Sequence, residues 1–445
     1  MPNEGNTLLF KDFWVFGAGH PGDFFKGHVL VENGTIQQVF GEHALPAVIP
    51  PHWQVEEGNG KILMPGLCIG HTHIYSTFAR GWLVSPFSPG SFRELLEQLW
   101  WRLDRSLTLE GISASGLVSA VEWIRNGVTS VVDHHASPNA IRGSLDALAQ
   151  SVCGQAGLRG VFCYEVSDRD GHLKALEGIA ENVQFGKQPP RFPGRSAGMM
   201  GLHASFTLED STLVEVAGQQ MPIHVHVAEG REDRELHVQR FGTSAVQRLL
   251  GAGVLVPGSL LAHCLRLEPG DQETLHQQEA CVVVNPQSNM NNGAGFFPYA
   301  DFRGSSLPVL LGNDGYGFDI TRDMRTLLLG ENLRYSDPTA FSLHDLFQVA
   351  FHATPGFIGE KLGVRLGRIS PGYAADFVTY AYLPPTPMRP ENFLGHFFFG
   401  IMESEKPVDT IVAGRFLMRN KQLELDRRAI FAHARTVCQK TWERA

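Results

Sequence analysis

The stretch Ile62-Leu-Met-Pro-Gly-Leu-Cys-Ile-Gly-His-Thr-His73 decides the fold, because an apolar run typical of a buried strand ends there in two histidines. Successive side chains of a strand point to opposite faces, so His71 and His73 share one face. Two imidazoles at a strand end can bind one metal ion. The motif is not specific by itself, since a chain with 19 histidines contains about one His-x-His by chance. A second one lies at His224 and His226.

Three later segments carry further metal-binding and acid–base residues, each at the end of a short apolar run. They are His226-Val-Ala-Glu229, Leu260-Leu-Ala-His263 and Val309-Leu-Leu-Gly-Asn-Asp314. Parity cannot choose between His224 and His226, because both side chains point to one face. His226 lies nearer the carboxyl end of its strand and is the predicted ligand. His224 is then a structural residue one layer deeper.

Strand-like runs alternate with helical periodicity from about residue 62 to residue 365, which predicts a parallel sheet with crossover helices. Eight such units predict an α/β fold of the (β/α)8 TIM-barrel class. In that fold the carboxyl ends of the strands carry the chemistry, and all six groups named so far as ligands or acid–base residues fall there. The expected strands are 64–74, 128–133, 159–164, 198–203, 222–227, 259–263, 280–284 and 308–313.

Both terminal segments show strand and turn chemistry, and each is too small to form a core alone. We therefore expect residues 1–62 and 366–425 to pair into one small composite β-sandwich beside a barrel of residues 63–365. Residues 426–445 are expected to form an amphipathic helix.

Several motifs resemble the metal-dependent amidohydrolase superfamily over nearly the whole chain. Within it, the chain is similar to the deaminase and chlorohydrolase (ATZ/TRZ-like) branch, which includes cytosine, guanine, 8-oxoguanine and adenosylhomocysteine deaminases and s-triazine chlorohydrolases. The similarity is greatest to SsnA-type aminohydrolases. The stretches that carry it are Ser76-Thr-Phe-Ala-Arg-Gly81, Leu99-Trp-Trp-Arg-Leu-Asp-Arg105, Thr129-Ser-Val-Val-Asp-His-His-Ala-Ser137, His224-Val-His-Val-Ala-Glu229, Ser288-Asn-Met-Asn-Asn292 and Pro384-Pro-Thr-Pro387.

The resemblance and the strand ends together predict one divalent metal ion, Zn2+ by preference and Fe2+ as the alternative, since both suit a site of three imidazoles and one carboxylate. The expected ligands are His71, His73, His226 and Asp314, and the expected catalytic residues are Glu229, His263 and Asp314. Binuclear members of the superfamily carry a bridging lysine at the end of the fourth strand. This chain has His203 there instead, so a mononuclear site is expected.

Residues that could contact the substrate follow the other strand ends. His203 and Arg80 are the first two candidates, and one of His134 and His135 is the third, with His135 preferred. Gln287 and Asn289 could hydrogen-bond to the polar edge of a heterocycle. Alternatively, they could belong to a loop that Asx turns stabilise. Trp100 and Trp101 could stack on a flat ring or pack a helix on the barrel. Arg142, Arg159 and Arg80 are the arginines that could anchor a carboxylate tail.

The predicted function is hydrolytic deamination of an amino-substituted N-heterocycle, purine- or pterin-like, by a metal-bound hydroxide. Ring opening of a cyclic amide uses the same nucleophile and stays open as an alternative, and chlorohydrolase-like displacement and a non-catalytic scaffold are more remote ones. The exact ring and its leaving group are not settled by the residues.

Composition narrows the partners and the compartment. The net charge of −9, without a block of Lys or Arg, argues against nucleic acid or an anionic membrane as a partner. No apolar run is long enough to span a membrane, and the start Met1-Pro-Asn-Glu-Gly5 lacks the features of a signal peptide. The six Cys form no framework, which favours a reduced, cytoplasmic protein. Family members are often dimers, so a homodimer is consistent with the resemblance.

Overall fold

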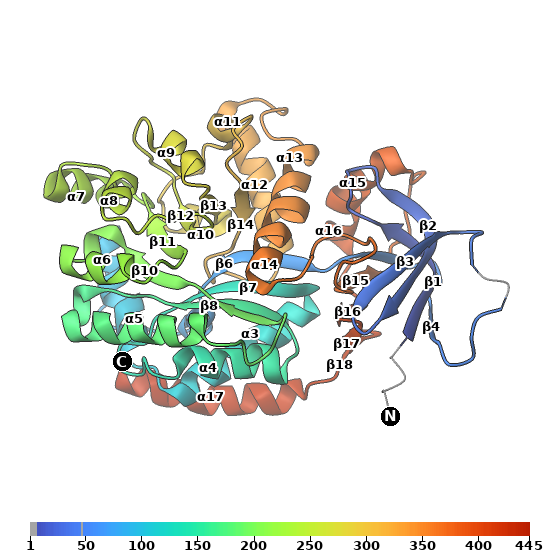
Figure 1. Cartoon of the computed structure of the whole chain (residues 1–445), viewed down its shortest axis with the longest axis horizontal. Helices are drawn as coiled ribbons and strands as arrows, with labels where there is room; N and C mark the ends of the chain where they lie inside the picture. Colours follow the sequence, from blue (N-terminus) through green and yellow to red (C-terminus); the bar gives the residue numbers. More distant parts are fainter. Residues whose placement is uncertain (1–6, 46–47) are drawn as a thin grey trace.

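The computed structural model describes residues 7–45 and 48–445, so the start Met1–Gly5 considered above lies outside the described residues. Figure 1 shows two lobes, between which the chain crosses around residue 65, within residues 362–377 and within residues 423–427. The larger lobe contains the parallel strands and most helices, and the smaller contains strands from both terminal segments.

The larger lobe confirms the predicted parallel α/β architecture. Its strands pair in two parallel sheets, of order β6-β7-β8-β9 and β10-β11-β12-β13-β14, rather than in one closed ring of the described residues. The strands are β6 (Leu67–Thr72), β7 (Val128–His135), β8 (Arg159–Tyr164), β9 (Ser196–Gly198), β10 (Met200–Ala204), β11 (Ile223–Val227), β12 (Leu260–His263), β13 (Cys281–Val284) and β14 (Val309–Leu311).

Two sets of contacts link these sheets where they meet. A parallel bridge joins Val166, after β8, to Leu202 in β10. At the other seam the backbone N–H groups of Asn313 and Asp314 lie 2.9 and 3.2 Å from the carbonyl oxygen of His71. The second contact sets the end of the last strand directly against the end of the first, which brings the ligands predicted there together.

Helices follow the strands, as expected for crossover connections. Thr108 caps the long helix α3 by accepting a hydrogen bond from the backbone N–H of Gly111, and the apolar face of α3 is buried. The helices are α1 (Phe92–Leu95), α2 (Trp101–Arg105), α3 (Leu109–Arg125), α4 (Ser144–Ala149), α5 (His172–Lys187), α6 (Asp210–Ala217), α7 (Arg231–Phe241), α8 (Ala245–Gly251), α9 (Asp271–Gln277), α10 (Pro286–Asn291), α11 (Tyr299–Phe302), α12 (Ile320–Tyr335), α13 (Leu343–Phe347), α14 (Thr354–Leu362), α15 (Phe393–His396), α16 (Met402–Ser404) and α17 (Arg427–Arg444).

The terminal segments combine in one nine-stranded sheet of order β18-β17-β16-β15-β5-β1-β2-β3, with β4 also paired to β1. β5 is the junction, because it pairs with β1 from the first segment and with β15 from the last. The strands are β1 (Thr7–Phe16), β2 (Phe24–Glu32), β3 (Thr35–Gly41), β4 (Gln54–Glu57), β5 (Ile62–Pro65), β15 (Phe377–Tyr380), β16 (Asp409–Val412), β17 (Arg415–Arg419) and β18 (Gln422–Leu423).

The first predicted strand, 64–74, is two strands in the structure. Gly66 separates β5 of the terminal sheet from β6 of the larger lobe. A Cβ at this position would lie 2.3 Å from the Thr129 side chain, so the close packing here requires glycine. The apolar run is continuous across this point, which is why periodicity does not reveal the break.

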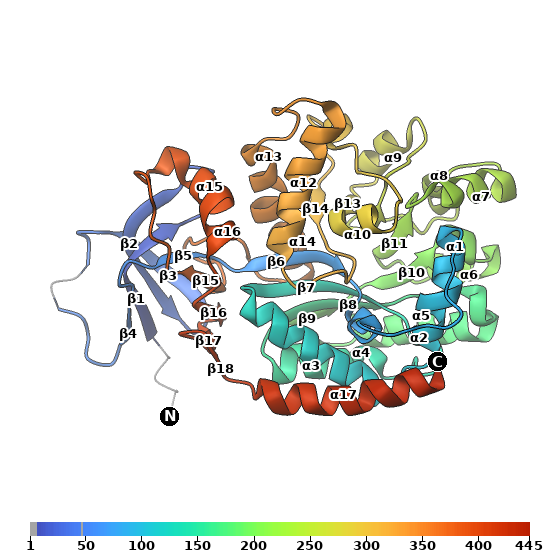
Figure 2. The same ribbon diagram turned by 180° about the vertical axis from the view of Figure 1, so that it is seen from behind.

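Helix α17 lies along α3 on the outside of the larger lobe (Figures 1 and 2). The indole Nε1 of Trp442 donates to the carbonyl oxygen of Phe78 at 2.7 Å, and Arg444 Nε donates to that of Ser106 at 3.0 Å. Phe78 belongs to the 3-10 helix Ile74–Ala79, which directly follows the first two predicted ligands. None of the helices in residues 7–45 and 48–445 is long and apolar enough to cross a membrane.

A buried ion pair between Arg159, at the start of β8, and Asp376 joins the two lobes. Arg159 Nε and Nη2 donate to the two carboxylate oxygens of Asp376 at 2.6 and 2.8 Å, and the residues are only 3% and 6% exposed. Asp376 also accepts a hydrogen bond from the backbone N–H of Ala413.

Arg159→Met is expected to lower the free energy of unfolding by about 3–5 kcal/mol, because it leaves the Asp376 carboxylate buried without its cation. Chemical denaturation measures the change. The double variant Arg159→Met/Asp376→Asn should recover most of it, since the amide oxygen can still accept from Ala413. Equal destabilisation of the single and double variants would show that the unpaired charge is not the cause.

Candidate metal centre and active site

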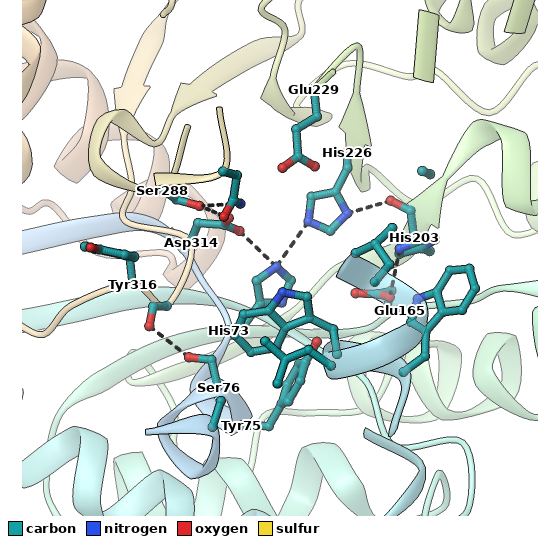
Figure 3. A pocket seen from close by; sticks show the side chains of 18 of the residues that line it. His73, Tyr75, Ser76, Glu165, His203, His226, Glu229, Ser288, Asp314 and Tyr316 are labelled. Carbon is teal, nitrogen blue, oxygen red and sulfur yellow. Dashed lines mark hydrogen bonds and ion pairs between the residues drawn. The ribbon is translucent and has the colours of Figure 1, made fainter. Parts of the chain in front are cut away.

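Four side chains from three strand ends converge on one point. The Nε2 atoms of His71 and His73 each lie 3.1 Å from Asp314 Oδ1, and Nε2 of His73 lies 3.2 Å from Nε2 of His226. The candidate ligand atoms of all four residues lie within 4.8 Å of one another. Figure 3 shows His73, His226 and Asp314 pointing toward this common centre. The structure thus brings together the four residues predicted as ligands.

The hydrogen bonds of the three imidazoles suit metal ligation. Nδ1 of His73 donates to the carbonyl oxygen of His134 at 2.6 Å, and Nδ1 of His226 donates to that of His203 at 2.7 Å. Each Nε2 therefore carries a lone pair directed at the centre. Nδ1 of His71 lies 2.8 Å from Nε2 of His224, which can accept its proton. Three such nitrogens and a carboxylate fit one divalent ion with an open position.

His224→Ala is expected to weaken zinc affinity by about 10- to 100-fold, because Nδ1 of His71 then loses the acceptor that fixes its orientation. Competition with a chelator measures the affinity. His224→Gln retains an acceptor oxygen and should show the smaller loss. Unchanged affinity in the Ala variant would show that His224 does not orient the ligand.

Glu229, His263 and Asp314 form the acid–base side of the same centre. Nε2 of His263 lies 3.6 Å from Glu229 Oε2 and 4.0 Å from Asp314 Oδ1. Asn289 Oδ1 accepts from Nδ1 of His263 at 2.8 Å, and the Ser288 hydroxyl donates to Asp314 Oδ2 at 2.6 Å. These bonds orient both groups toward Glu229.

The two carboxyl groups of this cluster have opposite pKa shifts. Burial, with the nearby charges of Asp314 and Asp233, raises the pKa of Glu229 well above its usual value. Burial acts in the same direction on Asp314, but the close imidazoles of His71, His73 and His263 together outweigh it and hold its pKa well below the usual range. Divergent pKa values of this kind suit an acid and a base working in one site.

A cavity of about 300 Å3 opens onto the centre. One side carries carboxylates and imidazoles, and the other is apolar and aromatic. Its lining includes His73, Tyr75, Ser76, Arg80, Leu96, Leu99, Trp100, Trp101, Glu165, His203, Phe206, His226, Glu229, Asp233, Ser288, Asn292, Asp314 and Tyr316. Both tryptophans predicted either to stack or to pack reach it, and Trp101 also contacts the ring of His203 edge-on at 6.2 Å.

Two of the five predicted substrate contacts line the cavity. His203 reaches it from the end of β10, and Arg80 reaches it with its guanidinium stacked 3.7 Å over the ring of Phe318. The cavity is of the size that binds small ligands.

The other three predicted contacts point elsewhere. Nε2 of His135 bonds to the Ser137 hydroxyl in the protein interior, Gln287 donates to Asp323, and Asn289 bonds to His263. None of His135, Gln287 and Asn289 is among the described residues that line the cavity.

Neither of the two remaining candidate arginines reaches the cavity. Arg159 is engaged by Asp376, and Arg142 is an exposed residue that lies 3.2 Å from Glu177. Among the cavity-lining residues described, Arg80 is the one Arg or Lys, whereas four carboxylates line the same cavity, those of Glu165, Glu229, Asp233 and Asp314.

Four further residues line the cavity that were not predicted from the sequence, namely Glu165, Tyr75, Asn292 and Tyr316. A signal for Glu165 was available, because it directly follows β8 and so occupies the same kind of strand-end position as the ligands. The other three lie on short helices or loops. Tertiary packing decides which way their side chains point, so the sequence pattern does not predict it.

Comparisons with known proteins agree with this geometry. The model of the amidohydrolase family matches residues 62–417. A 5-methylthioadenosine/S-adenosylhomocysteine deaminase of Syntrophomonas wolfei is 27% identical over 93% of this chain and 94% of its own. A 5'-deoxyadenosine deaminase of Methanothermobacter thermautotrophicus is 29% identical over 96% of both. The crystal structure of an adenosine deaminase from Xanthomonas campestris with bound zinc has a TM-score of 0.81 at 21% identity and 98% coverage of each chain, which shows a shared fold.

Proposed function

Because the chain belongs to the amidohydrolase family and is a hydrolase of carbon–nitrogen bonds, we propose that it deaminates an amino-substituted N-heterocycle. The reaction uses one divalent metal ion. The observation that carries the proposal is the convergence of three imidazole Nε2 atoms, one carboxylate and a separate raised-pKa carboxyl group on one cavity. The deaminase names of relatives that match nearly the whole chain support the reaction type.

We propose His71, His73, His226 and Asp314 as the ligands of this ion and Zn2+ as its identity, with Fe2+ fitting the same donor set. When bound, such an ion supplies Lewis acidity that lowers the pKa of water from 15.7 toward about 7. A single ion is favoured because His203, and not a bridging lysine, lies at the end of β10.

In the proposed mechanism Asp314 accepts the proton of the attacking water on its carboxylate, which the Ser288 hydroxyl holds through Oδ2. His263 presents the lone pair of Nε2 between the two carboxyl groups, where it can accept a hydrogen bond from the attacking water and orient it. Glu229, kept protonated by burial, donates from its carboxyl to the ring nitrogen next to the reacting carbon. The ionised Glu229 then takes the hydroxyl proton of the adduct and passes it to the amine, which leaves as ammonia while the ring carbonyl forms. The proton held by Asp314 restores the acid form of Glu229.

We also propose that the eight strand positions from β6 to β14, with β9 and β10 as one, form a closed (β/α)8 barrel of residues 63–365. Outside the barrel, we propose one composite domain of residues 1–62 and 366–425 and a C-terminal helix of residues 426–445. The contacts at both seams of the parallel sheets support the closure.

The test is ammonia release by protein of measured metal content from a panel of aminopurines, adenosine-type nucleosides, pterins, aminopyrimidines and aminotriazines. Release from at least one ring, lost on metal removal and restored by zinc or iron, supports the proposal. If the metal-loaded protein releases no ammonia from any compound of the panel but removes the ring absorbance of a cyclic amide, the reaction is ring opening and not deamination.

A further inference from the structure

Glu165 is a buried carboxylate that the proposed mechanism does not use. It follows β8, is 5% exposed, and its side chain lines the cavity. A carboxylate oxygen of Glu165 and one ring nitrogen each of His73, His134 and His226 lie within 4.8 Å of one another. Figure 3 shows Glu165 and His203 on one side of His226 and Asp314 on the other.

Two imidazoles are the near polar neighbours of the Glu165 carboxylate. Nδ1 of His134 lies 3.2 Å from Oε2, and Nε2 of His203 lies 3.6 Å from Oε1, and each is an ion-pair contact only where its ring is protonated. Nε2 of His134 donates to the carbonyl oxygen of His224, so in the neutral ring Nδ1 has no proton to give. No Arg or Lys pairs with Glu165 in residues 7–45 and 48–445. The carboxylate therefore has lone pairs available to hydrogen-bond donors of a ligand in the cavity.

His203 adds a second acceptor beside the carboxylate. The Thr207 hydroxyl donates to the carbonyl oxygen of Ala204, so it accepts the Nδ1 proton of His203 at 3.0 Å. Nε2 of the neutral ring then carries a lone pair directed toward Glu165 and the cavity.

We propose that Glu165 and His203 are an acceptor pair that selects heterocycles carrying a ring N–H donor in addition to the amine that is removed. This inference rests on the proposed function, because it names the substrate class of the same cavity. The closeness of Glu165 to the ligand nitrogens assigns the contact to the ring edge and not to a distant substituent.

This selection distinguishes the chain from the relatives named above. Apart from its reacting amine, the adenine ring of an adenosine-type nucleoside presents only acceptor nitrogens, which would face the Glu165 carboxylate lone pair to lone pair. Such a contact leaves both partners unsatisfied and is disfavoured. Rings with an N–H next to the reacting carbon, as in 2-amino-4-oxo heterocycles, satisfy the carboxylate.

The test compares matched rings that differ only in N–H against N–CH3 at the ring edge. We expect kcat/KM of the wild type to be at least about 100-fold higher for the N–H ring, since a site built to bind an N–H strongly rejects the analogue that lacks it. Glu165→Gln should lose at least about 10-fold of this preference, because a charged acceptor is replaced by a neutral amide. Glu165→Asp should retain more of it.

Glu331→Gln is the matched control, because Glu331 is also buried, lies outside the cavity lining and accepts a backbone N–H that an amide oxygen can still accept. Calorimetric binding of the deaminated N–H and N–CH3 rings gives a second readout that needs no turnover. The wild-type comparison stands even where a variant fails to fold.

The outcomes separate the two claims. A wild type that releases ammonia fastest from adenosine-type nucleosides, or a Glu165→Gln variant with unchanged ring preference, overturns the acceptor pair and leaves the deaminase function standing. N–H-dependent binding without ammonia release from any ring overturns the deaminase function and retains the acceptor pair. Absence of both binding and release from the metal-loaded protein overturns both.

Discussion

Glu229→Gln is expected to lower kcat by about 10³- to 10⁴-fold and to leave the metal content unchanged. A glutamine can neither protonate the ring nitrogen nor return a proton to the amine, and one well-placed acid–base group contributes about 10²- to 10⁴-fold. Glu229 lies 3.6 Å from His263 and outside the group of four candidate ligands that includes Asp314, so its charge is not needed to hold the ion. Ammonia release and metal analysis on the same preparation measure the two effects.

Glu235→Gln is the control for this substitution, since Glu235 is an exposed residue of α7, follows Glu229 closely in the sequence and does not line the cavity. It should retain wild-type turnover. Loss of the metal in Glu229→Gln would assign Glu229 to the ligand set, and activity within 10-fold of wild type would remove it from the proton transfers.

His73→Ala is expected to reduce the bound metal to background and turnover by more than about 10³-fold. His73 is the central ligand, with Nε2 3.1 Å from Asp314 Oδ1 and 3.2 Å from Nε2 of His226, and its loss leaves too few donors for a closed coordination shell. Thermal unfolding adds a second measurement. Added zinc should raise the Tm of the wild type by mass action and leave that of the variant unchanged.

The control is His344→Ala, because His344 is an exposed residue of α13 far from the cavity lining. It should bind metal and turn over as the wild type does. Full metal content in His73→Ala would mean that the ion is held by a different set of side chains.

The ligands could be predicted from the sequence because each depends on a short-range rule. Apolar runs mark the strands, alternation places His71 and His73 on one face, and the carboxyl ends of parallel strands meet at one edge. The structure brings the six predicted ligand and acid–base residues together for this reason.

Which residues line the cavity could not be predicted by the same short-range rules. The segment Asn285–Asn289, read as a loop facing the substrate, is instead the start of the helix α10. Successive residues of a helix point about 100° apart, so Gln287 turns to Asp323, Ser288 to Asp314 and Asn289 to His263. Only the three-dimensional packing of α10 decides which of these meets the cavity. Glu165, in contrast, directly follows a strand, so the rule that predicted the ligands could also have predicted its place in the cavity.

The sheet shared by both terminal segments has a consequence for the order of events during synthesis. Lys61 meets Asp409 across 348 residues of chain, and Phe78 meets Trp442 across 364. The strand that leads into the first two ligands, and the short helix that follows them, thus leave the ribosome long before the segments that hold them in place. The contacts that β5 and this short helix make with β15, β16 and α17 can therefore form only after the last of the chain has emerged.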